Sequence, residues 1–487
     1  MSELRGLTDA CVHCGFCLPA CPTYQLDDSA SAAHGWAAPN EMDSPRGRIH
    51  LIRQLLDLGQ APDDRPSAGG RLSAGGRTGG SDGRTGGSDG RTAPVPRPDL
   101  VASVRRHLDT CLGCLACVSA CPSGVAYDRI IAEARVMVEP ARGPIDRLRR
   151  AAIFALFPYP RRLAALRGPL WLAQRLRLDR LVARLSPSTE DGSDALAGRG
   201  ARGLRQITGT VGTLARLSPP VRPRTRLPAR VPATPPRRGV VGLLTGCVQS
   251  AFFSEVSAAT ARVLAAEGYE VVVPRGQSCC GALAAHTGRA EQARRQARAT
   301  IALFDEPGVD VVVTDVAGCG SAMKEYAHLL RDDPVWGARA AGFAARVRDV
   351  TEVLAAAEPV ARRHPVSLTV AYHDACHLSH GQGIRSQPRA LLAGIPELRL
   401  VPIPPAEVDV CCGSAGVYNL LQPSPAARLG ARKAAAIRAT GAQLVVAGNP
   451  GCLLQIRAAL AADGGPPLPV RHTVELLDAS LAGRSLT

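Results

Sequence analysis

The sequence predicts an α+β multidomain protein, in which a helical, cysteine-rich N-terminal domain precedes two similar α/β lobes. Three observations support this fold class. Two four-cysteine runs lie near the N-terminus, short β-branched runs alternate with Ala-rich stretches from residue 239 onward, and a Cys…Cys-Cys-Gly…Cys pattern occurs twice within that alternation. A length of 487 residues is enough for about three domains, and a hydrophobic content of 46% is enough for their cores.

The expected domains follow changes in composition along the chain. Residues 1–140 form the N-terminal domain, which carries a low-complexity insert at 66–92 where Arg-Thr-Gly-Gly-Ser-Asp-Gly is repeated. Such a composition cannot bury a core and is typical of a flexible linker. Residues 141–238 form a basic connector that is partly helical and rich in Pro toward its end. The two lobes are expected at 239–365 and 366–487.

Residue patterns mark one helix in each of the first two segments. Ser44 can cap a helix that has Pro45 in its first turn, and the apolar residues of 49–56 then recur at helical spacing. In the connector, the apolar residues of 178–185 fall at i, i+3, i+4 and i+7, with Arg on another face.

The lobes are expected to alternate strands and helices. Runs of β-branched residues predict strands at 240–244, 271–273, 309–313, 368–371, 398–401 and 444–446. Ala-rich stretches predict helices near 251–267, 288–304 and 424–439. Strands that alternate with helices favour a mainly parallel sheet in each lobe.

The two N-terminal cysteine runs have the spacing of bacterial ferredoxins. Each run reads Cys-x2-Cys-x2-Cys-x3-Cys-Pro, starting at Cys11 and again at Cys111. This spacing is typical of [4Fe–4S] clusters, because a tight loop supplies three thiolates and the fourth comes from elsewhere. Zinc sites normally use two pairs of ligands instead, and free thiols are the remaining alternative. Two complete copies of the run favour two [4Fe–4S] clusters.

In two-cluster ferredoxins the fourth cysteine of each run binds the other cluster. We therefore expect each cluster to bind the first three cysteines of one run and the fourth cysteine of the other. The first cluster is expected to bind Cys11, Cys14, Cys17 and Cys121, and the second Cys111, Cys114, Cys117 and Cys21.

The other eight cysteines form the duplicated pattern, with similar gaps in both copies: Cys247, Cys279, Cys280 and Cys319, then Cys376, Cys411, Cys412 and Cys452. Most of them follow a predicted strand. Because the carboxyl ends of parallel strands meet at one edge of a sheet, four thiols are expected to converge in each lobe. These eight residues are candidate ligands of a further cluster or metal, and structural or redox-active thiols are the alternative.

Several side chains beside these cysteines have two interpretations. His373, His377 and His380 flank Cys376, and His286 follows Cys280. Imidazole can bind a metal or exchange a proton with a quinone, but hydrogen bonds that hold the cysteine loops are the favoured interpretation. Asp374 is expected to cap the helix that follows it.

The net charge of +16 is a local feature. Only two of the 58 basic residues are Lys, and residues 142–238 hold 21 Arg against five acidic residues, which accounts for the whole excess. We therefore expect no nucleic-acid partner. An iron–sulfur protein that binds nucleic acid or acts as a sensor is the non-enzymatic alternative, but such a role does not explain the two Cys-Cys-Gly copies. The basic amphipathic stretch at 145–185 suits an anionic membrane surface, a partner subunit or a solvated Arg face over an apolar stripe.

Other segments and motifs are missing from the sequence. The longest apolar run is far shorter than the ~20 residues of a spanning helix, and no secretory signal is recognised at the N-terminus. No Gly-x-Gly-x-x-Gly follows a predicted strand. An electron carrier without a hydride-accepting cofactor needs a partner that contains one.

The chain resembles the iron–sulfur subunits of glycolate oxidase, over most of its length outside 66–92 and the basic connector. Their relatives include iron–sulfur subunits of anaerobic glycerol-3-phosphate dehydrogenase and Cys-Cys-Gly subunits of heterodisulfide reductase. The matching stretches are His13-Cys14-Gly15-Phe16-Cys17, Cys21-Pro22-Thr23-Tyr24, Ser44-Pro45-Arg46-Gly47-Arg48, Tyr372-His373-Asp374-Ala375-Cys376-His377-Leu378, His380-Gly381-Gln382-Gly383-Ile384, Cys412-Gly413-Ser414-Ala415-Gly416-Val417-Tyr418-Asn419 and Gly448-Asn449-Pro450-Gly451-Cys452.

The resemblance implies an electron-transfer subunit of a glycolate-oxidising complex. A FAD-containing partner would oxidise glycolate to glyoxylate, and this chain would pass the electrons to a quinone-type acceptor. The expected location is cytoplasmic and peripheral, on the inner face of the cell membrane. A related glycerol-3-phosphate or lactate dehydrogenase, and a heterodisulfide-reductase-like thiol/disulfide reductase, are the alternatives. One departure counts against the reductase: relatives with an extra cluster end the pattern with Cys-x2-Cys, where this chain has Ala322 and Gln455.

Overall fold

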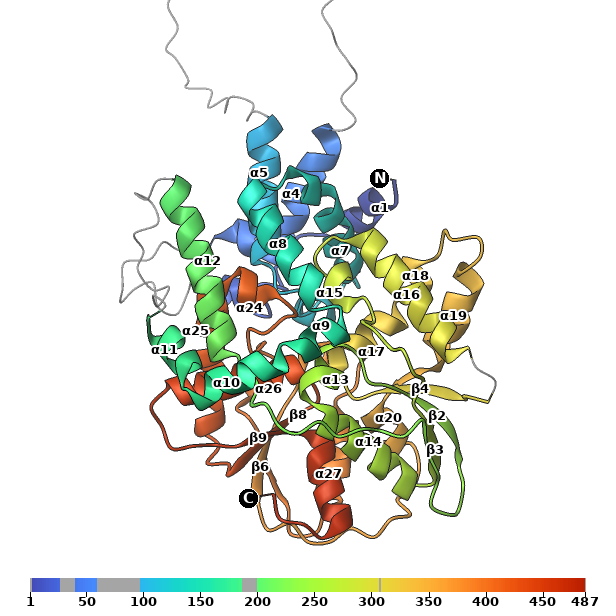
Figure 1. The fold of residues 1–487 in the computed structure, drawn as a ribbon. Coiled ribbons are helices and arrows are strands. Elements are labelled where there is room, and N and C mark those ends of the chain that lie inside the picture. Colours follow the sequence, from blue (N-terminus) through green and yellow to red (C-terminus); the bar gives the residue numbers. More distant parts are fainter. Residues whose placement is uncertain (1, 27–39, 59–96, 186–198, 306–307, 487) are drawn as a thin grey trace, which may run out of the picture.

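The computed structural model describes residues 2–26, 40–58, 97–185, 199–305 and 308–486. The low-complexity insert predicted at 66–92 lies outside these residues. In Figure 1 the N-terminal helices lie at the top, the connector helices pass over one side, and the two α/β lobes lie below. The protein is therefore an α+β multidomain protein, as the sequence predicts.

The N-terminal domain is helical throughout its described part. Its elements are α1 (Ser2–Asp9), α2 (Pro22–Gln25), η1 (Glu41–Asp43), α4 (Pro45–Leu58), α5 (Arg97–Thr110), α6 (Ala116–Ser119), α7 (Tyr127–Val138) and η2 (Glu139–Ala141). Ile52, Leu108 and Ile130 are fully buried in a core that α4, α5 and α7 share. The cap predicted for α4 is confirmed, because Ser44 Oγ accepts a hydrogen bond of 3.0 Å from Gly47 N.

Gly47 allows α4 to pack directly on η1. A Cβ atom on this residue would lie 2.0 Å from the carbonyl oxygen of Glu41, which no side chain tolerates. The close contact holds η1 and the adjoining Asp43 against the start of α4, beside the cysteine runs.

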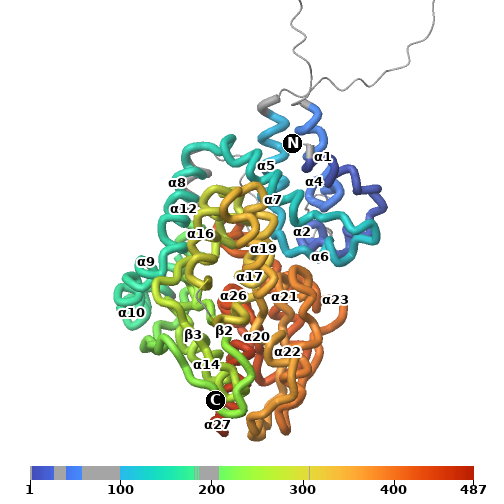
Figure 2. Tube along the Cα trace, turned by 90° about the vertical axis from the view of Figure 1, so that its right-hand side faces the viewer, coloured from blue at the N-terminus to red at the C-terminus, as the bar shows by residue number. Residues whose placement is uncertain are grey.

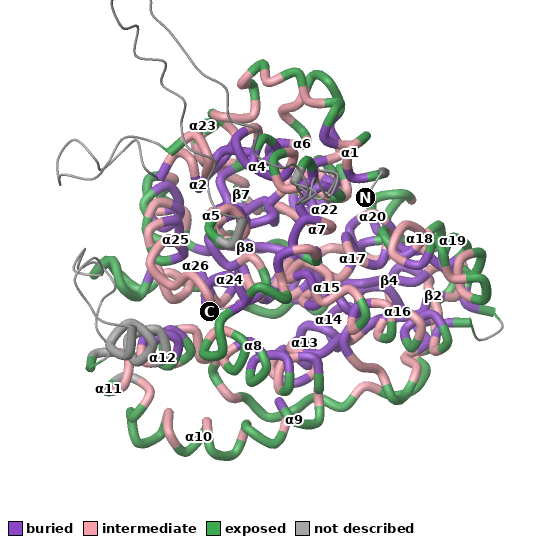
Figure 3. The backbone as a smooth tube through the Cα atoms, turned by 90° about the horizontal axis from the view of Figure 1, so that it is seen from above, coloured by how far each residue is buried: buried purple, intermediate pink, exposed green. Residues whose placement is uncertain are grey.

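The described part of the connector contains helices of six to 18 residues. They are α8 (Pro144–Leu156), α9 (Pro160–Ala165), α10 (Arg167–Arg175), α11 (Leu178–Leu185) and α12 (Arg199–Arg216). The helix predicted at 178–185 is confirmed by α11. In Figure 3, α9, α10 and α11 lie at the edge of the molecule and are mostly exposed or intermediate. Trp171, Leu176 and Leu185 are among their exposed apolar side chains, at 49%, 59% and 74% exposure.

Each lobe contains a small sheet, and the four parallel strands of each sheet follow the same order, to which the first sheet adds the antiparallel strand β1. The first is β1-β3-β2-β4-β5 and the second β7-β6-β8-β9. The strands are β1 (Arg230–Val231), β2 (Gly239–Leu244), β3 (Tyr269–Val272), β4 (Val311–Thr314), β5 (Val347–Asp349), β6 (Thr369–His373), β7 (Arg399–Val401), β8 (Leu444–Ala447) and β9 (Val470–His472). All neighbours are parallel except β1 and β3, so the mainly parallel sheets predicted from the sequence are confirmed.

Helices cover both sheets, as expected for parallel strands joined by crossovers. In the first lobe they are α13 (Val248–Phe252), α14 (Ser254–Ala266), α15 (Ala282–Ala285), α16 (Ala290–Phe304), α17 (Ala317–Lys324), α18 (Tyr326–Leu329), α19 (Gly337–Arg346) and α20 (Val350–Ala355). In the second they are α21 (Cys376–Ser379), α22 (Ser386–Ala393), α23 (Pro405–Val408), α24 (Tyr418–Leu421), α25 (Pro423–Arg438), α26 (Pro450–Ala462) and α27 (Thr473–Ala482).

The last strand of each sheet runs into a helix with the same N-terminal capping box. Asp349 caps α20 together with Glu352, and His472 caps α27 together with Glu475. The cap positions thus correspond in the two lobes, although one is an acid and the other a base. His472 Nε2 also donates to the Asp315 carbonyl oxygen of the first lobe at 2.8 Å.

The two lobes share one hydrophobic core. Val313 and Leu264 of the first lobe belong to the same cluster of buried side chains as Val445 and Leu476 of the second. The backbone N–H of Ala317 also donates to the Gly448 carbonyl oxygen at 3.1 Å. The ends of β4 and β8 are therefore held side by side, and the residues that follow them lie close together.

Candidate functional site

Cys21 lies with the first three cysteines of the second run, although 90 residues separate them in the sequence. Together Cys21, Cys111, Cys114 and Cys117 line a small enclosed space, with Tyr127 and Arg48 at its border. The side chains come from the start of α2, from the loop after α5 and from α6. This grouping is the one expected for the second cluster if the fourth cysteines are exchanged.

The loop that carries Cys111 and Cys114 turns its backbone toward sulfur. Gly113 has a φ of +66°, and its N–H donates to Cys111 Sγ at 3.3 Å. The Tyr127 hydroxyl approaches the same sulfur at 3.8 Å. Donors of this kind stabilise a thiolate, which is the form that binds metal.

Arg48 is a buried cation beside these thiols. Its side chain is 1% exposed, and Nη1 lies 3.9 Å from Cys21 Sγ. Nε donates to the His107 carbonyl oxygen at 2.7 Å and Nη2 to Thr110 Oγ1 at 2.9 Å, which fixes the guanidinium in place. Burial raises the pKa of Cys111, but Arg48 and Arg135 outweigh it and lower that pKa below its usual value.

The first run lies nearer the surface. Cys14 is exposed, whereas Cys11, Cys17 and Cys121 pack against the core of the N-terminal domain. Arg46 Nη1 donates to the His13 carbonyl oxygen at 3.0 Å and so holds the loop of the run. An exposed cysteine at the rim suits the end of an electron path that meets another protein.

The donor set of this domain fits two [4Fe–4S] clusters. It supplies eight free thiols, and one group of four encloses a common space beside a buried cation. Burial raises the pKa of Cys114 and Cys117 well above the usual value, so metal binding would have to displace their protons. A bound cluster of this type accepts and passes on single electrons.

The four thiols of each lobe also converge, as the sequence predicts. In the first lobe Cys247 contacts Cys279, Cys279 contacts Cys280, and Cys280 contacts Cys319. In the second lobe the same succession runs through Cys376, Cys411, Cys412 and Cys452. In the first lobe these cysteines follow β2 and β3 and lie at the start of α17, the helix after β4. In the second lobe they follow β6 and β7 and lie at the start of α26, the helix after β8.

The Cys-Cys-Gly motif makes the same turn in both lobes. Gly281 and Gly413 have φ values of +92° and +90°, and their N–H groups point to Cys279 Sγ at 3.4 Å and Cys411 Sγ at 3.5 Å. A Cβ on Gly413 would lie 2.5 Å from the Ala426 carbonyl oxygen. The glycine therefore provides a left-handed turn and lets a helix pack against it.

The N-terminal domain meets the second lobe at the thiols of both. Cys114 and Cys411 belong to one cluster of buried side chains, and Cys376 packs against that cluster. His377 Nε2 donates to the Gly113 carbonyl oxygen at 3.0 Å. Figure 2 shows α6 close to α21, where Ser119 Oγ and His380 Nδ1 are 2.9 Å apart.

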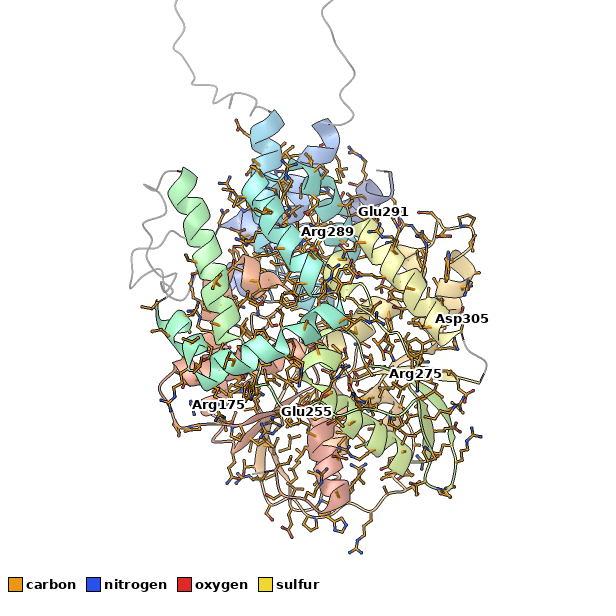
Figure 4. The ribbon with its side chains drawn as sticks, viewed as in Figure 1. Arg175, Glu255, Arg275, Arg289, Glu291 and Asp305 are labelled. Atoms are coloured by element: carbon orange, nitrogen blue, oxygen red, sulfur yellow. The ribbon has the colours of Figure 1, made fainter. Side chains whose placement is uncertain are left out.

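All eight lobe cysteines line a single cavity of about 620 Å³ between the lobes. Cys111 of the N-terminal domain reaches the same cavity, as do His286, His373 and His377. Other parts of its wall come from the connector helices and from residues within 414–422 and 449–454 of the second lobe. Arg289, labelled in Figure 4, lies over the Phe154 ring at 4.4 Å and joins α16 to α8 near this cavity.

The structure separates the roles of the predicted side chains. His377 and His380 form the loop-holding hydrogen bonds that the sequence favours. His286 Nε2 and His373 Nδ1, by contrast, are buried without a partner in the described part of the chain. The expectation for Asp374 is wrong: Ala375 occupies the cap position of α21, and Asp374 instead binds Arg389 through two hydrogen bonds of 2.8 and 2.5 Å.

The sequence patterns did not predict the burial of two cations that are fully enclosed in the described part of the chain. One is Arg48, and the other is Lys433, which is fully buried and donates to the Glu407 carbonyl oxygen near Cys411 and Cys412. Lys433 had a signal in the sequence, because it is one of only two lysines in a chain that otherwise uses Arg.

The chain matches three family models. Residues 8–125 match a 4Fe-4S dicluster domain, residues 145–187 match the linker region of the glycolate oxidase iron-sulfur subunit, and residues 241–324 and 370–457 each match the Cysteine-rich domain. The chain thus carries a dicluster domain and two Cys-Cys-Gly domains.

Known relatives cover nearly the whole chain. The probable glycolate oxidase iron-sulfur subunit of Bacillus subtilis (strain 168) is 31% identical over 93% of this chain and 89% of the relative. The glycolate oxidase iron-sulfur subunit of Escherichia coli (strain K12) is 28% identical over 98% of this chain and 95% of its own length. Lactate utilization protein A of Exiguobacterium sp. (strain ATCC BAA-1283 / AT1b) is 31% identical over 49% of this chain and 96% of its own length.

No helix in the described ranges is long and apolar enough to cross a bilayer.

Proposed function

Because the chain belongs to the family of glycolate oxidase iron–sulfur subunits, we propose that it carries electrons from a FAD-containing dehydrogenase subunit to a quinone. The partner would oxidise glycolate to glyoxylate. The relatives identify the chain as the iron–sulfur electron-transfer subunit of a glycolate oxidase-like or lactate utilization oxidoreductase. The substrate and the electron acceptor are what we propose.

The proposal is supported by the succession of cysteine groups from the surface of the N-terminal domain to the second lobe. The exposed Cys14 lies at one end, the enclosed group around Cys21 and Cys111 follows, and Cys114 adjoins Cys376 of the second lobe. We assign Cys11, Cys14, Cys17 and Cys121 to the first cluster, and Cys111, Cys114, Cys117 and Cys21 to the second. This order leads single electrons from the surface of the N-terminal domain toward the cavity between the lobes.

A partner is required by the chemistry of the substrate. Oxidation of an α-hydroxy acid removes a hydride, and single-electron clusters cannot accept one. The sequence offers no dinucleotide-binding fingerprint after a strand. The flavin therefore belongs to a second subunit, for which the rim around Cys14 is the proposed contact.

The connector suits peripheral contact with the inner face of the cell membrane. It carries the whole positive excess of the chain and exposes Leu148, Trp171, Leu172 and Leu181 at 49% to 71%. Arg beside exposed Leu and Trp is the composition of helices that lie in an anionic membrane interface. Binding to vesicles with and without anionic lipid, compared between the native chain and one with Trp171→Glu, tests this part of the proposal.

The electron-transfer proposal is tested with the complex and with the chain alone. The chain alone should not oxidise glycolate, and activity with a dye acceptor should appear only with the flavoprotein partner. Cys14→Ser or Cys114→Ser should slow electron transfer to quinone much more than reduction of the flavin by glycolate. Glycolate oxidation by the chain alone, or an unchanged quinone rate in both variants, would refute the proposal.

Lactate is a second candidate substrate for the complex. A lactate utilization protein matches half of this chain over nearly its own full length. Flavin reduction in the purified complex, measured with glycolate, lactate and glycerol 3-phosphate in parallel, distinguishes the three substrates.

A further inference from the structure

The cavity between the lobes is lined by thiols and by apolar side chains of the connector. All eight lobe thiols line it, as do Leu163, Leu170, Ala173 and Leu217 of the connector. The cavity therefore extends well beyond the space around the thiols. Apolar side chains dominate its lining, as in pockets for small organic ligands.

The charged groups of the cavity wall are already engaged. Arg142 binds Asp109 through two hydrogen bonds of 2.8 Å, and Arg150 contacts the same carboxylate at 3.3 Å. Arg135 donates to the backbone carbonyl oxygens of Leu108 and His286 at 3.1 and 2.7 Å. None of these three arginines is therefore available to bind the carboxylate of a small anionic substrate. An uncharged ligand does not need such a cation.

Two imidazoles mark the polar end of the cavity. The rings of His286 and His377 come from different lobes and meet edge to face, with centroids 4.8 Å apart. His286 Nε2 and His377 Nδ1 are both buried without a partner in the described residues. Because His377 Nε2 donates to the Gly113 carbonyl oxygen, the neutral ring leaves Nδ1 as an acceptor, whereas His286 Nε2 can donate to an oxygen of a ligand.

We propose that this cavity is the acceptor site, and that it binds the ring of a quinone between the lobes with its hydrocarbon tail against the connector helices. The inference rests on the proposed electron-transfer function and adds the place and the residues. One ring oxygen accepts from His286 Nε2, and the tail lies along Leu163, Leu170 and Leu217. Cys111, which we assign to the second cluster, lines the same cavity, so that cluster would deliver the electrons.

The reaction at this site balances with reactants already named. The quinone accepts two electrons, one at a time, that originate in the hydride taken from the α-hydroxy acid by the partner flavin. It also takes up two protons from water and leaves as hydroquinone. His286 Nε2 donates to a ring oxygen of the quinone, and His377 Nδ1 can accept a hydrogen bond from a hydroxyl of the hydroquinone.

The connector supplies an entrance from the membrane. Leu166 lines the cavity and is also 42% exposed, and Trp171 and Leu172 are exposed on α10, the helix that carries Leu170 and Ala173. In Figure 1, α10 and α9 run across the face of the molecule that is turned to the viewer, and α9 contacts α13. A membrane-soluble quinone can therefore reach the cavity without crossing water.

The test obstructs the apolar wall while leaving the thiols unchanged. Ala173→Phe fills the cavity from α10, and Ala165→Phe places the same ring on the exposed surface of α9, outside the cavity. In the complex with the flavoprotein partner, Ala173→Phe should lower the ratio of quinone-linked to dye-linked rate by about tenfold. Ala165→Phe should leave that ratio unchanged, and His286→Leu should raise the KM for quinone.

A binding measurement separates this inference from the proposed function. A photoreactive quinone analogue should label peptides that contain residues 156–173 or 283–286 in the full chain, and Ala173→Phe should abolish that label. If the native complex reduces quinone but the label lies elsewhere and Ala173→Phe has no effect, the cavity is not the acceptor site. If the native complex reduces a small disulfide and not a quinone, both proposals are wrong.

Discussion

Removal of the buried charge of Arg48 should lower the reduction potential of the cluster bound by Cys21 and Cys111. A nearby positive charge stabilises the added electron, so a neutral side chain makes reduction harder. Arg48→Gln removes the charge and keeps part of the hydrogen bonding to the His107 carbonyl oxygen and Thr110. The guanidinium lies 3.9 Å from Cys21 Sγ, which sets the upper limit of the effect.

The expected magnitude follows from that distance. At an effective dielectric constant of about 20, two unit charges about 4 Å apart interact by about 4 kcal/mol. The electron spreads over the whole cluster, and at a mean separation of about 7 Å the interaction falls to about 2.4 kcal/mol. For one electron this corresponds to a decrease of about 100 mV, with about 170 mV as the limit.

A redox titration followed by EPR measures both clusters in one sample. Arg48→Lys keeps the charge and should retain most of the native potential, which separates charge from packing. Arg106→Gln on the same domain is exposed and screened by solvent, so it should change neither potential appreciably. Unchanged potentials in Arg48→Gln, or a decrease confined to the cluster that Cys11→Ser removes, would refute the reasoning.

Three further outcomes are expected. Anaerobic reconstitution should give about eight Fe per chain; a much higher count would place clusters in the lobes as well, and stoichiometric zinc without iron would contradict the assignment. Cys21→Ser should remove the same EPR signal as Cys111→Ser, and a match with Cys11→Ser instead would exclude the ligand exchange. Asp349→Asn should make the free energy of unfolding less dependent on pH. Burial raises the pKa of Asp349 from 3.8 to about 7, so the folded protein binds this proton more tightly than the unfolded chain. The native protein therefore loses stability as the pH rises through that range. Thermal melting at pH 5 and pH 8 checks this, and equal pH dependence in both proteins would contradict it.

Local sequence signals were sufficient for much of the fold. The β-branched runs place β2, β6 and β8 within one or two residues of their observed bounds, because these central strands are buried on both faces. The Ser44 cap and the helix at 178–185 rest on contacts between residues near in sequence. The convergence of four thiols in each lobe follows from the rule that carboxyl ends of parallel strands share one edge.

Other features depend on contacts that the sequence pattern does not encode. The edge strands β5 and β9 have three residues each, too few for a periodic signal. Strand β4 begins at Val311 rather than Val309, because the Asp310 carboxylate accepts a hydrogen bond from Val240 N at 3.0 Å and ends the turn there. The cavity, the contact of Cys114 with the second lobe and the role of Arg48 all arise from docking between distant segments.

The matching helix caps of the two lobes use different residues, so they respond differently to pH. His472 Nδ1 accepts from Val474 N while Nε2 donates to Asp315, so the cap requires the neutral ring, and burial lowers its pKa to about 4. Acid therefore weakens the cap of the second lobe as the pH falls from about 6.5 toward 4. Asp349 responds in the opposite sense, since rising pH charges it within the first lobe. The corresponding caps of two copies of one architectural unit thus respond to pH in opposite directions, one weakened by acid and the other by base.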